Sequence, residues 1–328
     1  MTRHTKQIEI DKAGGNDTDQ EAPVGAPPSS KGRKAADQHV RPKKKVAWRS
    51  DAAASARIRA VRGDWLRESS PNSPEFREPF AGAGAVGLHA VAEQIHDRIW
   101  LNDRDSGLCS LWLACQQHAG RLKDAVRAFA PSVEAFTRWK EYFLSNPAMP
   151  DDDAELITVA CGRLALQPMS YGSLGPMAGA PRGGWHQQRG EILSRWNPAS
   201  MCQKIDAIAS LLEHARITNL DFSAVIGDEA ERAAIYCDPP YVSAGPRLYL
   251  HSFAEADHTR LCDLLRHTIH RWLLSYDDHP MVWDLYAKFA NIEKVEMRYS
   301  ATRSVKVHEL LIRPRSRRVL ATRQKAGR

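Results

Sequence analysis

Short apolar runs of strand length alternate with helix-length segments in two stretches of this sequence, and this alternation constrains the fold more than any other feature. The first stretch predicts two strands, at residues 76–80 and 99–101, with a helix at 85–96 between them. The second predicts strands at residues 215–219, 233–237, 271–275, 294–299 and 307–312, with helices at 256–270 and 281–289. Such alternation is typical of an α/β, doubly wound and mostly parallel sheet that binds ligands along its carboxyl edge.

Residues 106–212, between the two stretches, have mostly helical periodicity. Helices are predicted at residues 108–122, 133–144, 154–166 and 201–213. The Gly- and Pro-rich segment at residues 169–185 is long for a connection inside a compact domain, which is typical of a functional loop. We therefore predict a disordered basic tail at 1–42, an α/β domain from 43–109 and 213–314, an inserted, mainly helical subdomain at 110–212, and a basic mobile tail at 315–328.

Charge and cysteine usage narrow the class of protein. The 328 residues carry a formal net charge of +7, which favours a polyanionic partner such as nucleic acid. The six cysteines include no Cys-x-x-Cys pair, so we expect buried free thiols and no metal site. No apolar run approaches the roughly 20 residues of a membrane-spanning helix, and the polar N-terminus lacks a signal-peptide core. These features predict a cytoplasmic protein that does not bind membranes.

The strongest chemical signal is the segment Asp238-Pro239-Pro240-Tyr241, which directly follows the apolar run at 233–237. A central strand there would deliver the segment to the carboxyl edge of the sheet. The Asp238 carboxylate and the Pro239 carbonyl would accept the hydrogens of an amino group such as that of adenine, and so favour tetrahedral nitrogen during transfer. The prolines stiffen the turn, and the Tyr241 ring offers a stacking surface for an extruded base. An ordinary proline turn capped by Asp238 is the structural alternative.

The second signal is a turn rich in small residues, at 78–86, between the first predicted strand and its helix. Small residues allow a ligand to approach the backbone closely. The spacing of Gly82, Gly84 and Gly87 also matches the dinucleotide-binding fingerprint, and Asp103 stands where that fingerprint expects an acid for the ribose hydroxyls. These features indicate an adenosine cofactor, and the Asp238 segment favours S-adenosylmethionine over a nicotinamide dinucleotide.

A third element, Asp221-Phe222, follows the predicted strand at 215–219. Asp221 would accept a hydrogen bond from the adenine amino group of the cofactor, with Phe222 packed beside it. A helix N-cap or a loop acid is an equally weighted alternative for Asp221.

These segments together resemble the Dam-type family of DNA adenine methyltransferases. The resemblance covers most of residues 75–312 and rests on the joint order of several motifs. Beyond the three signals above it includes Leu101-Asn102-Asp103, Tyr249, Phe253, Asp257-His258, Leu261, Leu274-Ser275-Tyr276 and Glu309-Leu310-Leu311-Ile312. The order is that of methyltransferases whose cofactor motif precedes the catalytic one, with the target-recognition region between them. The resemblance implies a Rossmann-like methyltransferase sheet and direct transfer from S-adenosylmethionine to a flipped adenine in double-stranded DNA.

Residue roles follow from the resemblance. The base-holding loop would be Asp238, Pro239, Pro240 and Tyr241. The cofactor would contact Trp48, Glu78, Pro79, Phe80, Gly82, Gly84, Asp103, Asp221, Phe222 and Asp238. The family's N-terminal Trp-Ala-Gly-Gly-Lys segment has only a partial counterpart at residues 46–50, where the glycines and the lysine are absent and Trp48 is the candidate to pack over the cofactor.

The inserted region holds the candidate DNA contacts, because Arg and Gln suit the reading of guanine and adenine edges and aromatic rings suit a wedge between bases. The candidates are Tyr171, Arg182, Trp185, Gln187, Arg189 and Arg195. For any one of these side chains, a surface or phosphate-positioning role is the stronger expectation.

Several alternatives stay open from the sequence. The acceptor could be cytosine-N4, an RNA adenine or a protein amide, and the chain could be a non-catalytic DNA-binding protein on this fold or a nicotinamide-dependent enzyme. A homodimer and a cognate restriction endonuclease are open as partners, so the roles in restriction–modification or epigenetic regulation are both compatible with the sequence, as is association with the nucleoid.

Overall fold

The fold is described here from a computed structural model. The structure describes residues 64–69, 73–187, 190–243, 249–299 and 305–315. The chain divides into two compact units, Met1–Pro42 and Lys43–Arg328, and all described residues belong to the second. The predicted tail at 1–42, and that at 315–328 apart from its first residue, lie outside the described residues.

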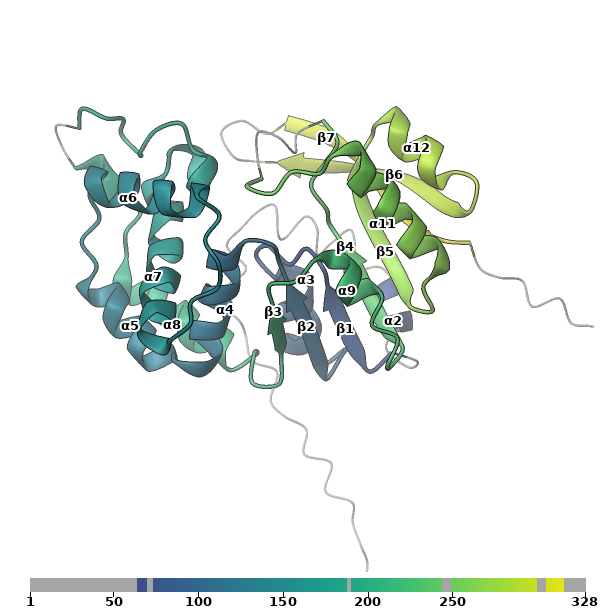
Figure 1. Ribbon diagram of the computed structural model, residues 1–328, viewed down its shortest axis with the longest axis horizontal. Helices are drawn as coiled ribbons and strands as arrows, with labels where there is room; N and C mark the ends of the chain where they lie inside the picture. The colour runs from purple at the N-terminus through teal and green to yellow at the C-terminus, as the bar shows by residue number, and fades with distance from the viewer. Residues whose placement is uncertain (1–63, 70–72, 188–189, 244–248, 300–304, 316–328) are drawn as a thin grey trace, which may run out of the picture. The chain divides into compact units, whose positions relative to one another are not determined.

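Seven strands form one sheet in the order β3-β2-β1-β4-β5-β7-β6 (Figure 1). Their bounds are β1 Glu75–Glu78, β2 Arg98–Asn102, β3 Arg216–Thr218, β4 Ala233–Cys237, β5 Arg271–Asp277, β6 Ala290–Tyr299 and β7 Val305–Pro314. The first five strands in this order pair in parallel, whereas β7 runs antiparallel to both β5 and β6. The predicted α/β class with a doubly wound, mostly parallel sheet is confirmed.

The strand order reverses at β1, which lies between β2 and β4. In an open parallel sheet, ligands bind outside the carboxyl ends of the strands at such a switch point, because the chain leaves the two neighbouring strands in opposite directions. The chain leaves β1 at Pro79, β2 at Asp103 and β4 at Asp238. The glycine turn, Asp103 and the Asp238 segment therefore meet at one place on one edge.

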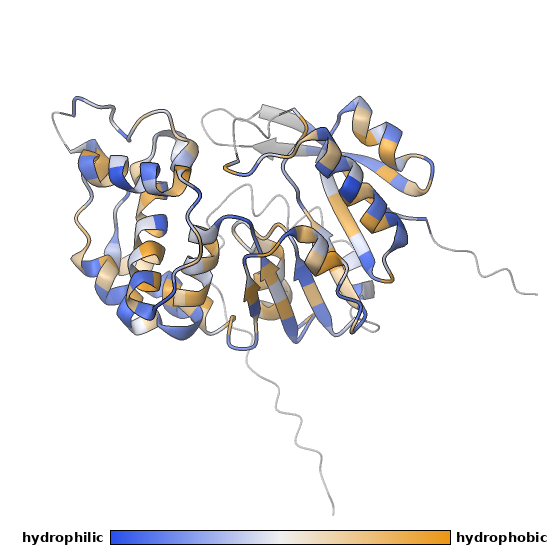
Figure 2. Cartoon of the chain, viewed as in Figure 1, coloured by the Kyte–Doolittle hydropathy of each residue, from blue (hydrophilic) through white to orange (hydrophobic). Residues whose placement is uncertain are grey.

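Helices cover both faces of the sheet, and a separate apolar core fills each interface. On one face, α2 (Asp64–Ser69), α3 (Ala85–Ala92) and α4 (Ser106–Gln117) pack with β1 and β2. On the other, α9 (Phe222–Ile226), α11 (Glu255–His267) and α12 (Pro280–Tyr286) pack on β4, β5 and β7. Figure 2 shows apolar residues along the central strands and mixed polarity on the surrounding helices. A sheet buried on both faces requires the near-continuous apolar strands seen in the sequence.

The helical region continues from α4 through α5 (Ala119–Ala128), α6 (Val133–Leu144), α7 (Asp153–Met169) and α8 (Pro198–Ala209). The single helix predicted at 108–122 is instead α4 followed by α5, because His118 takes non-helical angles of φ −135° and ψ 35° between them. Leu122 of α5, Leu156 of α7 and Ile205 of α8 lie in the same core cluster as the β-strand residue Leu101. This part of the helical region therefore shares the core of the sheet, and the domain limits at 110 and 212 stay a prediction.

A third apolar cluster joins α6, the end of α7 and the Gly/Pro-rich segment, which forms the 3-10 turns η2 (Tyr171–Ser173), η3 (Gly175–Met177) and η4 (Glu191–Leu193). The segment was predicted to be too irregular for core structure, yet Pro176 and Ala178 are buried in it. The segment buries apolar side chains although it has little regular secondary structure. Buried backbone groups in such a segment need other bonding partners, and Lys140 of α6 supplies one by donating to the Ala178 carbonyl at 2.7 Å.

All six cysteines are buried and free, as predicted. Across the described residues, no helix is both long and apolar enough to cross a membrane. The same residues include no cluster of three or more His, Cys, Asp or Glu side chains suited to a metal ion.

Candidate active site

A cavity of about 880 Å³ lies at the carboxyl edge of the sheet, beside the switch point. The sheet contributes its first wall through Pro79, Phe80, Ala81, Gly82, Ala83, Asp103, Asp238 and Pro240. Helices α4 and α7 contribute a second, which includes Leu108, Trp112, Arg163 and Gln167. The third wall comes from α9, α11 and the segment before α11, with Asp221, Phe222, His251, Phe253 and Arg260. The cavity thus gathers parts of the chain that are far apart in the sequence.

The glycine turn folds tightly against the end of β2. Gly82 and Gly84 have φ of 49° and 59°, a left-handed region that glycine enters without the steric penalty of a Cβ atom. The Ala81 N–H donates to the Asn102 carbonyl at 2.8 Å, and the Gly82 N–H donates to Asp103 Oδ2 at 2.8 Å. The turn is therefore fastened to β2 on the side that faces the cavity.

Glu78 and Gly84, two of the predicted cofactor contacts, are not among the residues that line the cavity. Glu78 is buried, and its Oε2 accepts a hydrogen bond from the Gly87 N–H at 2.8 Å. This bond satisfies a backbone donor in the first turn of α3, where no intrahelical partner exists. The structure therefore gives Glu78 a role in holding α3 against β1.

Gly87 allows this close approach, which gives a testable stability effect. A Cβ at Gly87 would lie 2.6 Å from Glu78 Oε2 and 3.1 Å from a Leu101 methyl group. We expect Gly87→Ala to lower the free energy of unfolding by about 1–3 kcal/mol, as overpacked sites do. Gly120→Ala is the matched control: its Cβ meets nothing within 4 Å, and the substitution should stabilise α5 by up to about 1 kcal/mol. Urea unfolding of both variants measures the difference, and equal midpoints would contradict the packing described.

Asp103 lies at the centre of the cavity wall. Its Oδ2 accepts from the Gly82 N–H, and its Oδ1 accepts from the Asp105 N–H at 2.9 Å. Burial and the nearby charge of Asp105 raise the pKa of Asp103 to about 6. A carboxylate held by two backbone donors at this position keeps a fixed orientation toward the cavity.

A buried ion pair lies directly behind Asp103. Asp105 is the N-cap of α4, where its Oδ1 accepts from the Leu108 N–H at 3.1 Å. Its Oδ2 accepts from Arg163 Nε at 3.1 Å and Nη2 at 3.0 Å. The two side chains are only 9% and 10% exposed. This two-bond pair connects the end of β2 to the middle of α7.

Three aromatic rings form an apolar wall of the cavity. The ring centroids of Phe80, Phe222 and Phe253 are 5.3 to 5.6 Å apart. The Arg260 guanidinium lies 4.3 Å from the Phe222 ring centroid and donates to both Asp221 oxygens, at 3.1 and 3.0 Å. The wall therefore presents aromatic surface together with one fixed ion pair.

Asp221 has features of both alternatives considered from the sequence, a helix N-cap and a side chain that faces a ligand site. It is the N-cap of α9, where Oδ1 accepts from the Ser223 N–H at 3.0 Å, and it also lines the cavity. Burial alone would raise the pKa of Asp221, but hydrogen bonds from Ser223 and Arg260 outweigh it and lower the pKa. Asp221 is thus a carboxylate that is already bonded to the protein.

The segment after β4 brings Asp238 and Pro240 into the cavity wall. Ser275 of β5 donates from its Oγ to Asp238 Oδ1 at 2.8 Å. Pro239 and Tyr241 are not among the lining residues. The Tyr241 side chain packs against the core between the sheet and α11, with its ring centroid 6.2 Å from that of Tyr276.

Residues 181–301 match the family of D12 class N6 adenine-specific DNA methyltransferases. Over this segment, which is less than half of its length, the chain is similar to adenine-specific DNA methyltransferases. The matched segment contains β4, the Asp238 segment, α11 and β5, whereas the glycine turn precedes it. No curated protein matches the chain.

The predicted DNA contacts fall into two groups. Arg182 donates to the Pro168 and Ser170 carbonyls, at 2.8 and 3.3 Å, so its guanidinium braces the Gly/Pro-rich segment. Gln187 has a similar role, because its amide bonds three backbone groups of the same segment. Tyr171 and Trp185 are 66% and 48% exposed and lie at its surface.

The remaining candidates are less defined. Arg195 is on the surface and bonds the Ser173 hydroxyl at 3.0 Å. Trp48 and Arg189 lie outside the described residues. Arg195 is not among the residues that line the cavity.

Sequence analysis did not assign a role to four side chains that shape the site: Arg163, Phe253, Arg260 and Ser275. Ser275 gave a usable signal, since it is a hydroxyl inside an otherwise apolar and aromatic strand. Arg163 gave none, because 58 residues separate it from its partner Asp105.

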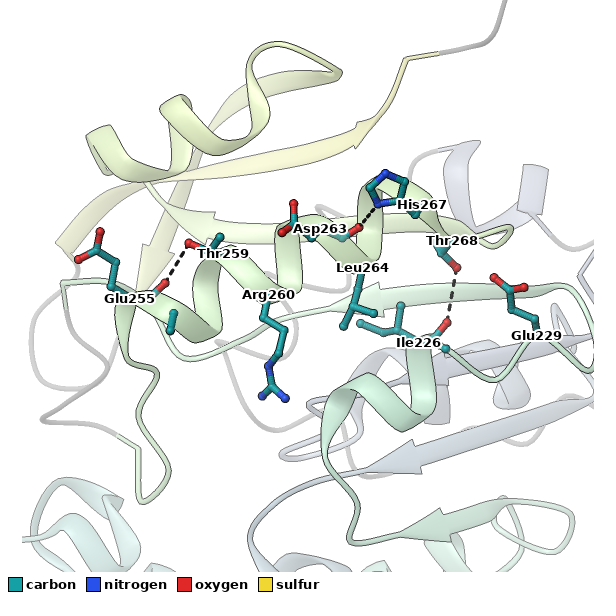
Figure 3. A pocket seen from close by; sticks show the side chains of 11 residues that line it. Ile226, Glu229, Glu255, Thr259, Arg260, Asp263, Leu264, His267 and Thr268 are labelled. Atoms are coloured by element: carbon teal, nitrogen blue, oxygen red, sulfur yellow. Dashed lines mark hydrogen bonds between the residues drawn. The ribbon is translucent and has the colours of Figure 1, made fainter.

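A second cavity, of about 810 Å³, lies between α9 and α11 (Figure 3). None of the predicted site residues lines it. The bonds drawn in Figure 3 are side chain to backbone, from Thr259 to the Glu255 carbonyl, from His267 to the Asp263 carbonyl and from Thr268 to the Ile226 carbonyl, so these polar groups serve the fold itself. The strand ends and the family motif favour the cavity at the sheet edge as the active site.

Proposed function

We propose that the methyltransferase uses S-adenosylmethionine to methylate the 6-amino group of an adenine that is flipped out of double-stranded DNA. One observation carries the proposal: Asp238, Asp103 and the glycine turn line a single cavity at the switch point of the sheet. The catalytic and cofactor motifs, about 150 residues apart in the sequence, therefore meet where a donor and an acceptor would have to meet.

The residues of the cavity fit the proposed cofactor. Asp103 would accept hydrogen bonds from the ribose hydroxyls, and the small residues of the glycine turn let the backbone approach closely. The aromatic wall of Phe80, Phe222 and Phe253 would border the adenine. When bound, S-adenosylmethionine supplies a methyl group on a positively charged sulfur. Trp48 stays a proposed cofactor contact.

The Asp238 segment would hold the target amino group. The Asp238 carboxylate accepts one amino hydrogen and the Pro239 carbonyl accepts the other, which draws the nitrogen lone pair out of the ring and toward the methyl group. The amino nitrogen would bond the methyl carbon directly as the carbon–sulfur bond breaks, the neutral thioether would leave and one amino proton would be lost, so no covalent enzyme intermediate would form. We assign Pro240 the role of stiffening this loop and Tyr241 that of the stacking partner of the base.

Base flipping follows from the depth of this site. An amino group stacked inside a duplex would not reach the half-buried Asp238 carboxylate in the cavity wall, so the base would have to leave the stack at a cost of a few kcal/mol. We propose that the helical region at 110–212 offsets this cost by binding DNA, with the exposed Tyr171, Trp185 and Arg195 at the contact surface and Arg182 and Gln187 holding their loop in shape.

A single assay tests the proposed reaction. The protein is incubated with methyl-labelled S-adenosylmethionine and duplex DNA, and the DNA is then digested to nucleosides. We expect the label in N6-methyladenine. Label in N4-methylcytosine would overturn the proposed acceptor, and transfer that requires single-stranded RNA would overturn the proposed substrate.

The raised pKa of Asp103 predicts a pH dependence of cofactor binding. Ribose hydroxyls bond best to the ionised carboxylate, so Kd for S-adenosylmethionine should rise as pH falls through about 6, by up to about tenfold per pH unit. Isothermal titration between about pH 5 and pH 7 measures this effect. Asp103→Asn should bind weakly with a flat profile, and a flat profile in the unaltered protein would contradict the assignment.

Stability should change with pH in the opposite sense. The pKa of Asp103 is raised in the folded state, from 3.8 to about 6, so protonation favours folding. The stability that Asp103 contributes is present below 3.8 and lost as pH rises through about 6. As pH rises toward about 6, cofactor binding should therefore strengthen while the contribution of Asp103 to stability declines. The opposite directions distinguish an effect on binding from an effect on folding.

A further inference from the structure

Strand β5 borders the Asp238 segment along its whole length. The parallel pairing of β4 with β5 ends at Cys237 and Leu274, so Asp238 lies one step further, beside Ser275. Successive side chains of a strand point to opposite faces, and Ser275 and Asp277 therefore lie on the same face. Ser275 is 1% exposed, a degree of burial at which a hydroxyl requires a bonding partner.

A chain of hydrogen bonds ends at the Asp238 carboxylate. The Tyr236 hydroxyl lies 3.0 Å from Ser275 Oγ, and Ser275 Oγ lies 2.8 Å from Asp238 Oδ1. Ser275 Oγ is also 3.4 Å from the Cys237 carbonyl, but the shorter contact to an ionised acceptor is the stronger one. Since Ser275 has one hydroxyl proton and gives it to Asp238, the Tyr236 hydroxyl must donate to Ser275 Oγ.

The far end of the segment is also fixed by β5. Asp277 Oδ1 accepts from the Val242 N–H at 3.0 Å, and Oδ2 accepts from the Ser243 N–H at 2.8 Å. The backbone after Tyr241 is therefore held in place by Asp277, while Ser275 bonds the Asp238 side chain at the other end of the segment.

We propose that Ser275 is a positioning residue for methyl transfer, and that Tyr236 acts through it. The inference rests on the proposed role of Asp238 as acceptor of the amino hydrogen. The Ser275 hydroxyl fixes the direction of the Asp238 oxygens, and its own bond from Tyr236 strengthens the contact, because linked hydrogen bonds polarise one another. Neither Ser275 nor Tyr236 touches the substrate in this arrangement.

The first test is the split between kcat and KM. Ser275→Ala should lower kcat by about ten- to a hundredfold, since a hydrogen bond to a charged group is lost from the acceptor. KM for DNA and Kd for S-adenosylmethionine should stay within about twofold, because no binding contact is removed. Ser275→Thr keeps the hydroxyl on a residue suited to strands and should retain most of the activity.

The second test is a double-mutant cycle with Tyr236→Phe, which removes one hydroxyl and little volume. Alone it should lower kcat by a few-fold. Combined with Ser275→Ala it should add little, because the proposed influence of Tyr236 on Asp238 passes through the Ser275 hydroxyl. Two effects that multiply would show that Tyr236 acts independently and would overturn the proposed chain.

The control is Ser110→Ala in α4. Ser110 is equally buried and its Oγ donates to the Ser106 carbonyl at 2.7 Å, so the substitution deletes the same atom in a buried place outside the cavity. An equal loss of kcat in this control, or unchanged kcat in Ser275→Ala, would overturn the inference while the proposed function stands. Absence of N6-methyladenine from the unaltered protein would overturn both. If Ser275→Ala does not fold, Ser275→Thr and Tyr236→Phe decide the question.

Discussion

Alanine in place of Asp238 is expected to lower kcat for methyl transfer by roughly 10³-fold or more, with DNA affinity nearly unchanged. The carboxylate acts on the amino group mainly as the nitrogen becomes tetrahedral, so its loss removes an interaction that the transition state makes and the ground state largely does not. Asp238 leaves β4 at the cavity, where Ser275 holds its Oδ1. Single-turnover kinetics with labelled S-adenosylmethionine measure the rate, and a DNA mobility shift measures binding.

Asp124→Ala is the matched control for this variant. Asp124 is 77% exposed in its side chain and pairs with Arg127 on the surface of α5. Its replacement removes a carboxylate of the same size and should leave kcat unchanged. Near-normal turnover by Asp238→Ala would contradict the catalytic assignment, and a parallel loss of DNA binding would show that Asp238 supports the fold or the DNA contact instead.

Sequence patterns predicted most accurately the elements whose surroundings are similar along their whole length. β4 has the predicted bounds, because it lies between β1 and β5 and all five of its side chains are buried. α6 also has the predicted bounds, since Ser132 caps its first turn by accepting from the Ala135 N–H. The edge strand β6 was predicted four residues too short, because residues 290–293 hold only two apolar side chains, Ala290 and Ile292, in alternation with polar ones, and it is pairing with β7 that makes them part of the strand.

The features that the sequence did not predict depend on contacts between distant segments. The place of Asp103 and Asp238 at one edge followed from the strand pattern, whereas the aromatic wall of Phe80, Phe222 and Phe253 required the fold. Gln187 was predicted to contact DNA, but it bonds backbone groups of its own segment. The residue type determines which chemistry a side chain can perform, whereas the packing of the fold determines which groups that side chain contacts.

The ion pair between Asp105 and Arg163 is such a contact, and its loss should have the largest effect on stability. Arg163→Met keeps most of the aliphatic stem and leaves Asp105 as a buried charge without its partner. We expect the free energy of unfolding to fall by about 3–5 kcal/mol, as it does when one member of a buried pair is removed. Both side chains are at most 10% exposed, so the Asp105 carboxylate has little solvation to offset the loss of the guanidinium. Urea unfolding followed by circular dichroism measures the loss.

A second substitution shows whether the lower stability of Arg163→Met comes from the lost ion pair or from lost packing. Asn at position 105 can still cap α4 by accepting from the Leu108 N–H, but it carries no charge. The double variant Asp105→Asn with Arg163→Met should therefore recover at least about 1 kcal/mol relative to Arg163→Met alone, because no unpaired charge stays buried. A double variant that is less stable than Arg163→Met would show that the arginine stem, and not its charge, joins the end of β2 to α7.

The same variants report on function, since Asp105 donates its backbone N–H to Asp103. If the ion pair orients Asp103, Arg163→Met weakens S-adenosylmethionine binding and the double variant restores it in part.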